Sequence, residues 1–311
     1  MSTVATPEKS ATAKTPPPRR GPRRSGMKWA PYLFVLPNMV LFATFTIYPA
    51  LNGFNLSLYD SSNGRTFTYV GMQNYQEILT SEEFWSVARA TAIFVVGTVI
   101  LTTVTATALA IALNAQQRGK GLLRAAYFVP FLVSPVVVGL IWRLALERQS
   151  GFLNTALEAI GLGQPGWLLE PGLALGVVIF VGLWIQVGFY ALIILAGLQG
   201  IDGSIYEAAT MDGATWSQQL RSITLPLLRP TTLVVIVLST IHAFQAFDYI
   251  YTLTGGGPLG ATTLIVQYIY ETSFQSPIQF GLASAAGVIL FLVVFGVTLI
   301  NYMAGRRREA V

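Results

Sequence analysis

The sequence of 311 residues contains no cysteine and few charged side chains. Without cysteine, the chain can form neither disulfides nor thiolate metal sites. Only 11% of the residues are charged and 53% are hydrophobic, whereas soluble domains carry roughly 25% charged residues. A soluble chain of this length would still need a solvated surface. The deficit in charge therefore indicates that much of the surface faces lipid.

The residues and motifs of catalytic sites are also scarce. The single histidine, His242, has no second ligand beside it in the sequence, which argues against a metal site. No Ser-His-Asp or paired-carboxylate arrangement is evident. The glycine run at 255–257 lacks the lysine and the serine or threonine that complete a nucleotide-binding P-loop. We therefore expect a chain that is not an enzyme and that holds no cofactor and no metal.

Long apolar segments stand where the charges are missing. About 20 apolar residues in a helix cross a hydrocarbon core of about 30 Å. One such segment alone could be a buried core helix, but several in a weakly charged chain indicate membrane spans. The sequence thus predicts an all-α polytopic membrane protein with about six transmembrane helices, the third interrupted by Pro130 and Pro135. The expected spans are about 31–50, 90–114, 122–142, 172–198, 231–249 and 281–303.

The basic residues predict the orientation, because they collect on the cytoplasmic side of a membrane. They are concentrated in the N-terminal tail, the loops after the second and fourth spans, and the C-terminus: Lys9, Lys14, Arg19, Arg20, Arg23, Arg24, Lys28, Arg118, Lys120, Arg124, Arg221, Arg229, Arg306, Arg307 and Arg308. The opposite side holds only Arg65, Arg89, Arg143 and Arg148. We expect both termini in the cytoplasm.

The expected organisation has three parts. Residues 1–28 lack apolar periodicity and are rich in proline and basic residues, which predicts a disordered cytosolic tail. Residues 29–306 form the transmembrane domain, and 307–311 a short cytosolic C-terminal tail. External segments are expected at 51–88, with Gly71 and Asn74 as turn residues, and at 147–171, where Gln164 to Trp167 predict a turn with an interfacial aromatic.

The cytoplasmic segment 199–230 is too long to be a simple connector. Ser204 followed by Glu207 fits a capping box at the start of a helix. Gly213 can adopt the left-handed conformation that ends this helix. The segment therefore begins with a short helix and a glycine turn.

A second short helix is expected directly after that turn. Thr215 followed by Gln218 forms a second capping box, and this helix should stop near Pro226. The pattern of helix, glycine turn and helix predicts a structured docking surface. The alternative is a stable interfacial helix pair without a partner.

This segment resembles the E-A-A…G…I-x-L-P loop of permease subunits of binding-protein-dependent ABC importers. The resemblance implies that the loop, about 200–228, inserts into a cleft on a cytosolic ATPase subunit as a coupling helix. It also implies that ATP and Mg bind to partner ATPase subunits. The matching positions are Glu207, Ala208, Ala209, Asp212, Gly213, Ala214, Ile223, Leu225 and Pro226.

The segment 247–258, with sequence FDYIYTLTGGGP, is similar to a segment of carbohydrate permeases of the maltose and lactose type. Alone, its three glycines and proline predict only a flexible external turn. The resemblance extends over roughly 30–305. It implies a sugar or oligosaccharide substrate and a place in the cytoplasmic (inner) membrane of a prokaryote. The implied partners are a second homologous permease subunit, two cytosolic ATPase subunits and an external substrate-binding protein.

Polar side chains within the fourth and fifth spans are the candidates for the substrate path, because such residues are costly in a membrane. Ser239, His242, Gln245 and Tyr249 fall near one helical face by their three- and four-residue spacing. Amides and carboxylates suit sugar hydroxyls, and aromatic faces suit the ring. His242 could instead bond between helices, Asp248 could serve a helix end, and Trp184 could pack in the core. The candidates are Gln245, His242, Asp248, Tyr249, Trp184 and Gln186.

Three alternatives remain open from the sequence. The first is an ABC permease for glycerol phosphate, a polyamine or phosphate, although an anion would favour basic residues along the path and the fourth and fifth spans have none. The second is a membrane scaffold protein with a docking loop, which would not need a polar face in the fifth span. The third is a secondary transporter, which should show paired broken helices or intramembrane acids.

Overall fold

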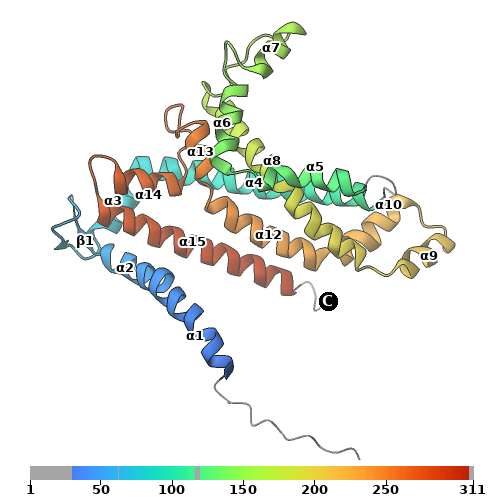
Figure 1. Ribbon diagram of the computed structural model, residues 1–311, viewed down its shortest axis with the longest axis horizontal. Helices are drawn as coiled ribbons and strands as arrows, with labels where there is room; N and C mark the ends of the chain where they lie inside the picture. Colours follow the sequence, from blue (N-terminus) through green and yellow to red (C-terminus); the bar gives the residue numbers. More distant parts are fainter. Residues whose placement is uncertain (1–29, 62, 116–119, 308–311) are drawn as a thin grey trace, which may run out of the picture. The chain divides into compact units, whose positions relative to one another are not determined.

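The computed structural model describes residues 30–61, 63–115 and 120–307 (Figure 1). The predicted tail at 1–28, the last four residues of the predicted C-terminal tail, and Arg118 lie outside the described residues. The described chain divides into two units, one ending at Ala50 and the other beginning at Leu51, and each is described separately.

The first unit is a single apolar helical run. Helix α1 (Ala30–Phe42) continues through the π-helical segment η1 (Ala43–Ile47) into α2 (Tyr48–Leu56), whose later residues belong to the second unit. All side chains described between residues 32 and 50 are exposed. An apolar helix of this length suits a membrane span, and Tyr32–Leu56 matches the first predicted span.

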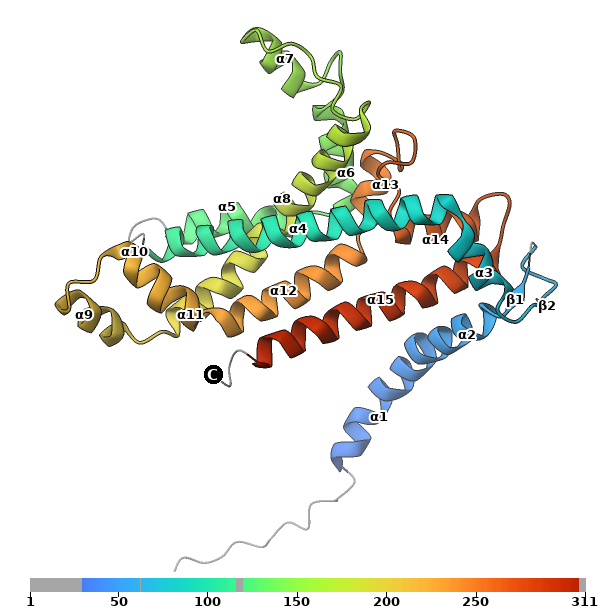
Figure 2. The same ribbon diagram turned by 180° about the vertical axis from the view of Figure 1, so that it is seen from behind.

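The second unit is built from helices and one short hairpin (Figures 1 and 2). Strands β1 (Tyr59–Asp60) and β2 (Thr68–Tyr69) pair antiparallel. The helical elements are α3 (Gln73–Thr80), α4 (Glu82–Ala115), α5 (Lys120–Leu132), α6 (Pro135–Ala145), α7 (Phe152–Ala159), α8 (Pro171–Gln199), α9 (Gly203–Met211), α10 (Trp216–Gln219), η2 (Leu220–Thr224), α11 (Leu225–Leu227), α12 (Arg229–Phe244), α13 (Asp248–Leu253), α14 (Ile265–Phe274) and α15 (Phe280–Arg307).

The prediction of about six membrane spans agrees with the helices of the described chain. Four are long and apolar enough to cross a membrane: Tyr32–Leu56, Glu82–Ala115, Pro171–Gln199 and Phe280–Met303. The two other predicted spans are bent pairs, Gly121–Leu132 with Pro135–Ala145 and Trp216–Leu227 with Arg229–Phe244. If each bent pair counts as one span, the total is six.

Proline explains the sharper bend, which measures 97° between α5 and α6. The residue before a proline is pushed out of the helical region. Ser134, which precedes Pro135, has ψ 129° and ends the helix as expected. Pro130 behaves differently from the prediction, because α5 continues through it to Leu132. The third span is therefore broken once, at residues 133–134.

The core of the second unit is the pair α4 and α8, against which α5 and α12 also pack. Helix α12 lies between α4 and α15 (Figures 1 and 2). Small residues allow close helix approach within membranes. Gly188 of α8 is such a residue, because a β-carbon there would overlap the carbonyl oxygen of Tyr127 in α5. Helices α5 and α8 are thus in close backbone contact at this position.

The segment before α4, which was predicted to be external, differs from the prediction at one residue. Gly71 has φ +61° and is a turn residue as expected. Asn74 is not; it lies in α3, is buried, and its amide donates 2.9 Å hydrogen bonds to the carbonyl oxygens of Ser57 and Tyr59. Its side chain therefore fastens the helix to the hairpin instead of shaping a turn.

Candidate functional site

Helix α9 opens the predicted docking loop, but its cap differs from the predicted one. Asp202 is the N-cap, and its carboxylate accepts a 3.0 Å hydrogen bond from the backbone N–H of Ser204. This bond lowers the pKa of the Asp202 carboxyl. The predicted Ser204–Glu207 capping box is therefore wrong, because the acidic residue two positions earlier takes the capping role. The side chain of Glu207 is exposed and forms no hydrogen bond or ion pair with another described residue.

The turn after α9 follows the prediction. Gly213 has φ +79°, in the left-handed region, and its N–H donates to the Thr210 carbonyl at 3.0 Å. Thr215 and Gln218 form the predicted capping box at the start of α10. A short helix, a left-handed glycine and a second short helix therefore stand in the predicted order.

The end of the second helix is a correction. The chain does not stop near Pro226; it continues through η2 and α11 and bends by 63° at Leu228, before α12. In η2 the N–H of Leu225 donates to the Leu220 carbonyl, five residues back. The wider π turn accommodates Pro226, which lacks an N–H and would clash in a regular helix.

Side-chain hydrogen bonds fasten the loop into one piece. The hydroxyl of Tyr206 lies 3.0 Å from that of Thr224, so α9 is tied to the far end of the loop. The amide of Gln219 donates to Thr210 at 3.0 Å and to the Ala214 carbonyl at 3.2 Å. These bonds connect the start of the loop to its end, and α12 follows it directly.

The loop lies at one end of the second unit, beyond the ends of α4 and α8 (Figure 1). Two large apolar side chains at its turn are strongly exposed, Met211 by 88% and Trp216 by 69%. Exposed apolar side chains beside the charges of Glu207 and Asp212 suit a protein partner. Of the other predicted residues, Ala208 and Leu225 are exposed, and Ala209, Ala214, Ile223 and Pro226 are partly buried.

The fifth span is not one continuous helix. Helix α12 ends at Phe244, and α13 starts at Asp248 after Phe247, whose φ is −147°. The prediction that Tyr249 shares a face with Ser239 and His242 is therefore wrong. Tyr249 is buried and its hydroxyl donates to the Val178 carbonyl of α8 at 3.3 Å.

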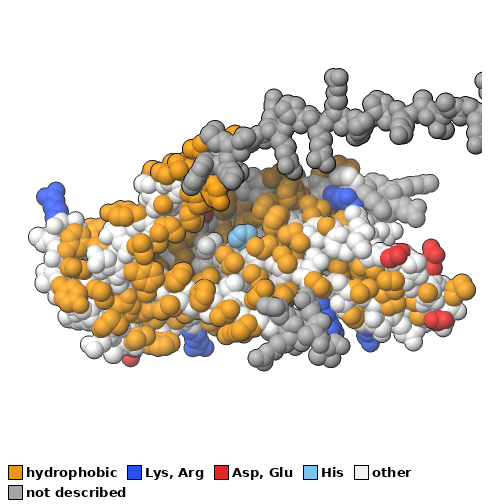
Figure 3. Space-filling model, turned by 90° about the horizontal axis from the view of Figure 1, so that it is seen from below, with side chains coloured by type: hydrophobic (Ala, Val, Ile, Leu, Met, Phe, Trp, Pro, Cys, Tyr) orange, Lys and Arg blue, Asp and Glu red, His pale blue; other side chains and the backbone are white. Residues whose placement is uncertain are grey.

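The break leaves three predicted polar residues exposed. Gln245 lies in the break and Asp248 begins α13, and no side-chain hydrogen bond of either is found within the described chain. His242 is exposed as well, but its Nδ1 lies 2.8 Å from the hydroxyl of Tyr190 in α8. Figure 3 shows the single histidine, in pale blue, among hydrophobic side chains. Exposed polar groups in an apolar helix need a partner or a water-filled path.

The candidates on α8 lie beside this region in the fold. Trp184 packs edge-on against Trp142 of α6, with ring centroids 5.6 Å apart, as expected of a packing residue. Gln186 is partly buried, and its Oε1 is a buried oxygen without a hydrogen-bond partner. Thr98 and Thr102 of α4 also carry buried hydroxyls without a hydrogen-bond partner, and neither is among the residues predicted from the sequence. Their four-residue spacing on one helix face is the signal that could have found them.

Comparison with known proteins shows similarity to permease subunits of transport systems. Residues 103–309 match the family described as binding-protein-dependent transport system inner membrane component. The trehalose/maltose transport system permease protein of Thermococcus litoralis is 35% identical over 279 residues, which cover 89% of this chain and 94% of that protein. The sn-glycerol-3-phosphate transport system permease protein of Agrobacterium fabrum is 32% identical, covering 90% and 96%.

A solved structure has the same fold. It is the bacterial alginate ABC transporter in complex with an alginate pentasaccharide-bound periplasmic protein. Its matching chain is 25% identical, with a TM-score of 0.80, and the match covers 90% of this chain and 94% of that chain.

No group of three or more histidine, aspartate or glutamate side chains in the described part of the chain could hold a metal ion.

Proposed function

Because the chain belongs to the family of binding-protein-dependent transport system inner membrane components, we propose that it is the permease subunit of an ATP-driven importer of a sugar or oligosaccharide. The exposed loop from α9 to α11 is the observation that carries the proposal. A permease with no nucleotide-binding motif of its own needs a surface through which an ATPase can act. The trehalose/maltose relative and the alginate transporter support a carbohydrate substrate.

In this proposal, the loop docks in a cleft on a cytosolic ATPase subunit. Met211 and Trp216 supply the apolar contact, and Glu207 and Asp212 can pair with basic side chains of the partner. ATP and Mg bind to the two ATPase subunits, whose closure displaces the loop. Since η2 and α11 join the loop directly to α12, the displacement reaches the polar residues at the end of that helix.

The substrate path runs past the break between α12 and α13 and along a second, homologous permease subunit. Gln245 offers an amide that can both donate to and accept from a sugar hydroxyl. His242 and Asp248 stand on the same stretch, and Trp184 and Gln186 lie on the neighbouring α8. An external substrate-binding protein delivers the sugar. These assignments rest on the exposure of the polar groups at the break.

We expect Gln245→Leu to reduce sugar-dependent transport by roughly tenfold or more. Losing an amide that bonds a buried sugar hydroxyl typically costs about 1–3 kcal/mol, and tenfold corresponds to about 1.4 kcal/mol. The measurement is sugar uptake per assembled complex in proteoliposomes. Basal ATP hydrolysis should stay unchanged because the Gln245 side chain is exposed and forms no hydrogen bond within the described chain.

Gln76→Leu is the matched control, since Gln76 is also exposed but lies on α3, away from α12. It should transport as the unmodified chain does. If Gln245→Leu lowers only expression or assembly, with normal uptake per complex, the path does not pass Gln245. The search would then move to Trp184 and Gln186 on α8.

We also propose that both termini and the docking loop face the cytoplasm of a prokaryotic plasma membrane, and that the 255–260 loop faces outside. The chain has no cysteine, so single cysteines can be labelled cleanly. An impermeant maleimide added outside intact cells should label a cysteine at Leu259, which is 97% exposed, and not one at Met211. Labelling of Met211→Cys from outside would show that the orientation is the opposite of the proposed one.

The second candidate substrate is a glycerol phosphate, favoured by the Agrobacterium fabrum relative. Helix α8 contains no lysine or arginine, and α12 has only Arg229 at its first position. An anion would be poorly stabilised by such a path, so a neutral sugar fits better. The deciding experiment measures ATP hydrolysis by the complex with its binding protein against a panel of sugars and glycerol 3-phosphate. If glycerol 3-phosphate stimulates ATP hydrolysis and none of the sugars does, the sugar assignment is wrong.

A further inference from the structure

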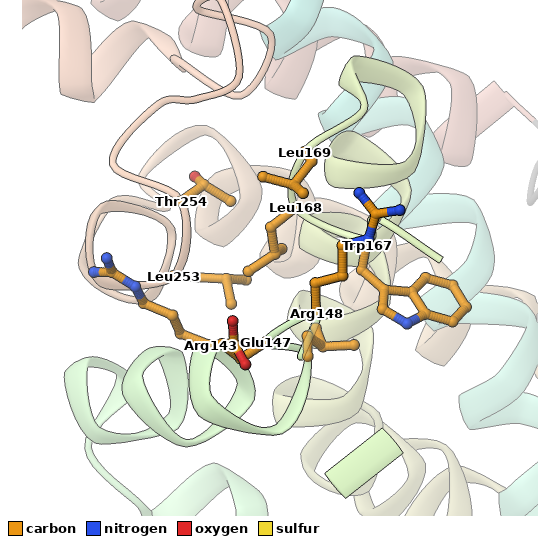
Figure 4. Close-up of a pocket in the computed structure, with 10 residues that line it drawn as sticks. Arg143, Glu147, Arg148, Trp167, Leu168, Leu169, Leu253 and Thr254 are labelled. Carbon is orange, nitrogen blue, oxygen red and sulfur yellow. The ribbon is translucent and has the colours of Figure 1, made fainter. Parts of the chain in front are cut away.

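A pocket of about 290 Å³ lies at the end of α6, and none of the candidate substrate-path residues lines it. Its walls come from the last turn of α6, the segment after it, the segment before α8, and the end of α13 (Figure 4). Leu146, Leu168 and Leu253 supply apolar wall, and Thr254 and Trp167 supply polar and aromatic rim. The proposed transport function assigns no role to this pocket.

Two arginines give the pocket its charge. Figure 4 shows the side chains of Arg143 and Arg148 on opposite sides of Glu147, with Leu253 and Leu168 between them. Both arginines are exposed, and neither forms an ion pair with another described residue. Arginine recognises phosphate in a planar, two-bond geometry. In a chain with only 11% charged residues, two exposed guanidinium groups without an ion pair in the described chain line the same pocket, where they can bind an anionic group.

Glu147 cancels only part of this charge. Its Oε2 accepts hydrogen bonds from the backbone N–H groups of Gln149 and Ser150, at 3.1 and 2.6 Å, and from the Ser150 hydroxyl at 2.7 Å. These bonds, that of the Ser150 hydroxyl first, lower the pKa of the Glu147 carboxyl, so it stays ionised. Two arginines and one glutamate leave a net charge of +1 on the lining, which matches a group with one negative charge.

The surface next to the pocket indicates which kind of molecule carries the negatively charged group. Val136, Leu140 and Arg143 follow one another at helical spacing on α6, and the two apolar side chains are exposed by 46% and 51%. Ile141 and Leu144 extend this apolar surface, exposed by 55% and 65%. An apolar strip that ends in arginines beside a tryptophan is typical of a membrane interface. Acyl chains fit the strip, and a headgroup fits the pocket at its end.

We propose that this pocket binds the phosphodiester of an anionic phospholipid, with its acyl chains along the exposed face of α6. Arg143 and Arg148 hold the phosphate from two sides, and the leucines cover the glycerol end. A bound lipid at this position fixes α6 to α13, whose ends both line the pocket. The proposal depends on the chain lying in a membrane and not on the identity of the transported solute, so either can fail without the other.

The test uses the full chain co-purified with its partner subunits in detergent, stripped of lipid and titrated with dioleoylphosphatidylglycerol. Lipid bound per complex is counted by native mass spectrometry. We expect Arg143→Gln/Arg148→Gln to bind this lipid about tenfold more weakly at one site, because charge-assisted hydrogen bonds are lost. Arg65→Gln/Arg89→Gln, which removes two exposed arginines outside the pocket, should bind as the unmodified chain does.

Three ligand comparisons separate the possible sources of the phosphate. Glycerophosphoglycerol, which lacks acyl chains, and inorganic phosphate should not displace the lipid at equal concentration. Dioleoylphosphatidylcholine, whose headgroup has no net charge, should bind more weakly. Displacement by inorganic phosphate, equal binding of phosphatidylcholine, or unchanged lipid binding by the double variant would each overturn the proposal. So would a loss of binding-protein affinity in that variant with lipid binding intact, since the pocket would then serve protein docking.

Discussion

Gly213→Leu is expected to lower ATP-driven transport by about tenfold while the chain still inserts into the membrane. Gly213 has φ +79°, and a residue with a β-carbon pays roughly 1–2 kcal/mol for this conformation. No atom lies within 4 Å of a β-carbon at this position, so the effect comes from the backbone alone. The turn would relax and reorient α10 against α9, which misaligns the proposed ATPase contact.

Gly203→Leu is the matched control for this substitution. Gly203 lies in the first turn of α9 of the same loop, has no positive φ, and also has nothing within 4 Å of an added β-carbon. Transport and ATPase association should be close to normal in this variant. Both variants would be compared for uptake in proteoliposomes and for co-purification of the ATPase. Normal values for Gly213→Leu would remove the loop from the coupling mechanism.

Gly188→Val is expected to prevent the chain from folding stably. A β-carbon at Gly188 would overlap the Tyr127 carbonyl oxygen, a backbone atom that cannot turn aside. Helices α5 and α8 would have to separate, and overpacking of this kind costs about 3 kcal/mol or more. The measurement is the yield of chain that elutes as a single species from a size-exclusion column in detergent, and its thermal unfolding temperature.

Gly176→Val on the same helix provides the comparison. Nothing lies within 4 Å of a β-carbon at Gly176, so this change adds the same side chain without a clash. It should leave yield and unfolding temperature nearly unchanged. Equal behaviour of the two variants, whether both stable or both lost, would show that backbone contact between α5 and α8 does not hold this pair of helices.

The docking loop was largely predictable because its signals are local. Gly213 and the Thr215–Gln218 box act through neighbouring residues, and both were placed correctly. The cap of α9 was not, since Asp202 and Ser204 are equally good N-caps and only the three-dimensional structure distinguishes them. The continuation through Pro226 was missed because a π turn leaves no sequence signature.

The break in the fifth span could not be predicted, because contacts distant in sequence stabilise it. Neither glycine nor proline occurs in residues 245–247. The new direction of α13 is held instead by Tyr249, bonded to the Val178 carbonyl, and by Thr252, whose hydroxyl lies 3.3 Å from the Val136 carbonyl of α6. By contrast, Pro135 predicted the break between α5 and α6, although the angle between the two helices could not be predicted from it.

The central claim is that this chain forms the membrane path of an ATP-driven importer, and reconstituted uptake tests it most directly. The chain and its partner subunits would be placed in proteoliposomes, with the binding protein and a labelled sugar on one side and ATP on the other. The account predicts uptake that requires ATP on the side of the docking loop, requires the binding protein, and falls about tenfold with Gly213→Leu. Uptake that proceeds at full rate without ATP would contradict it.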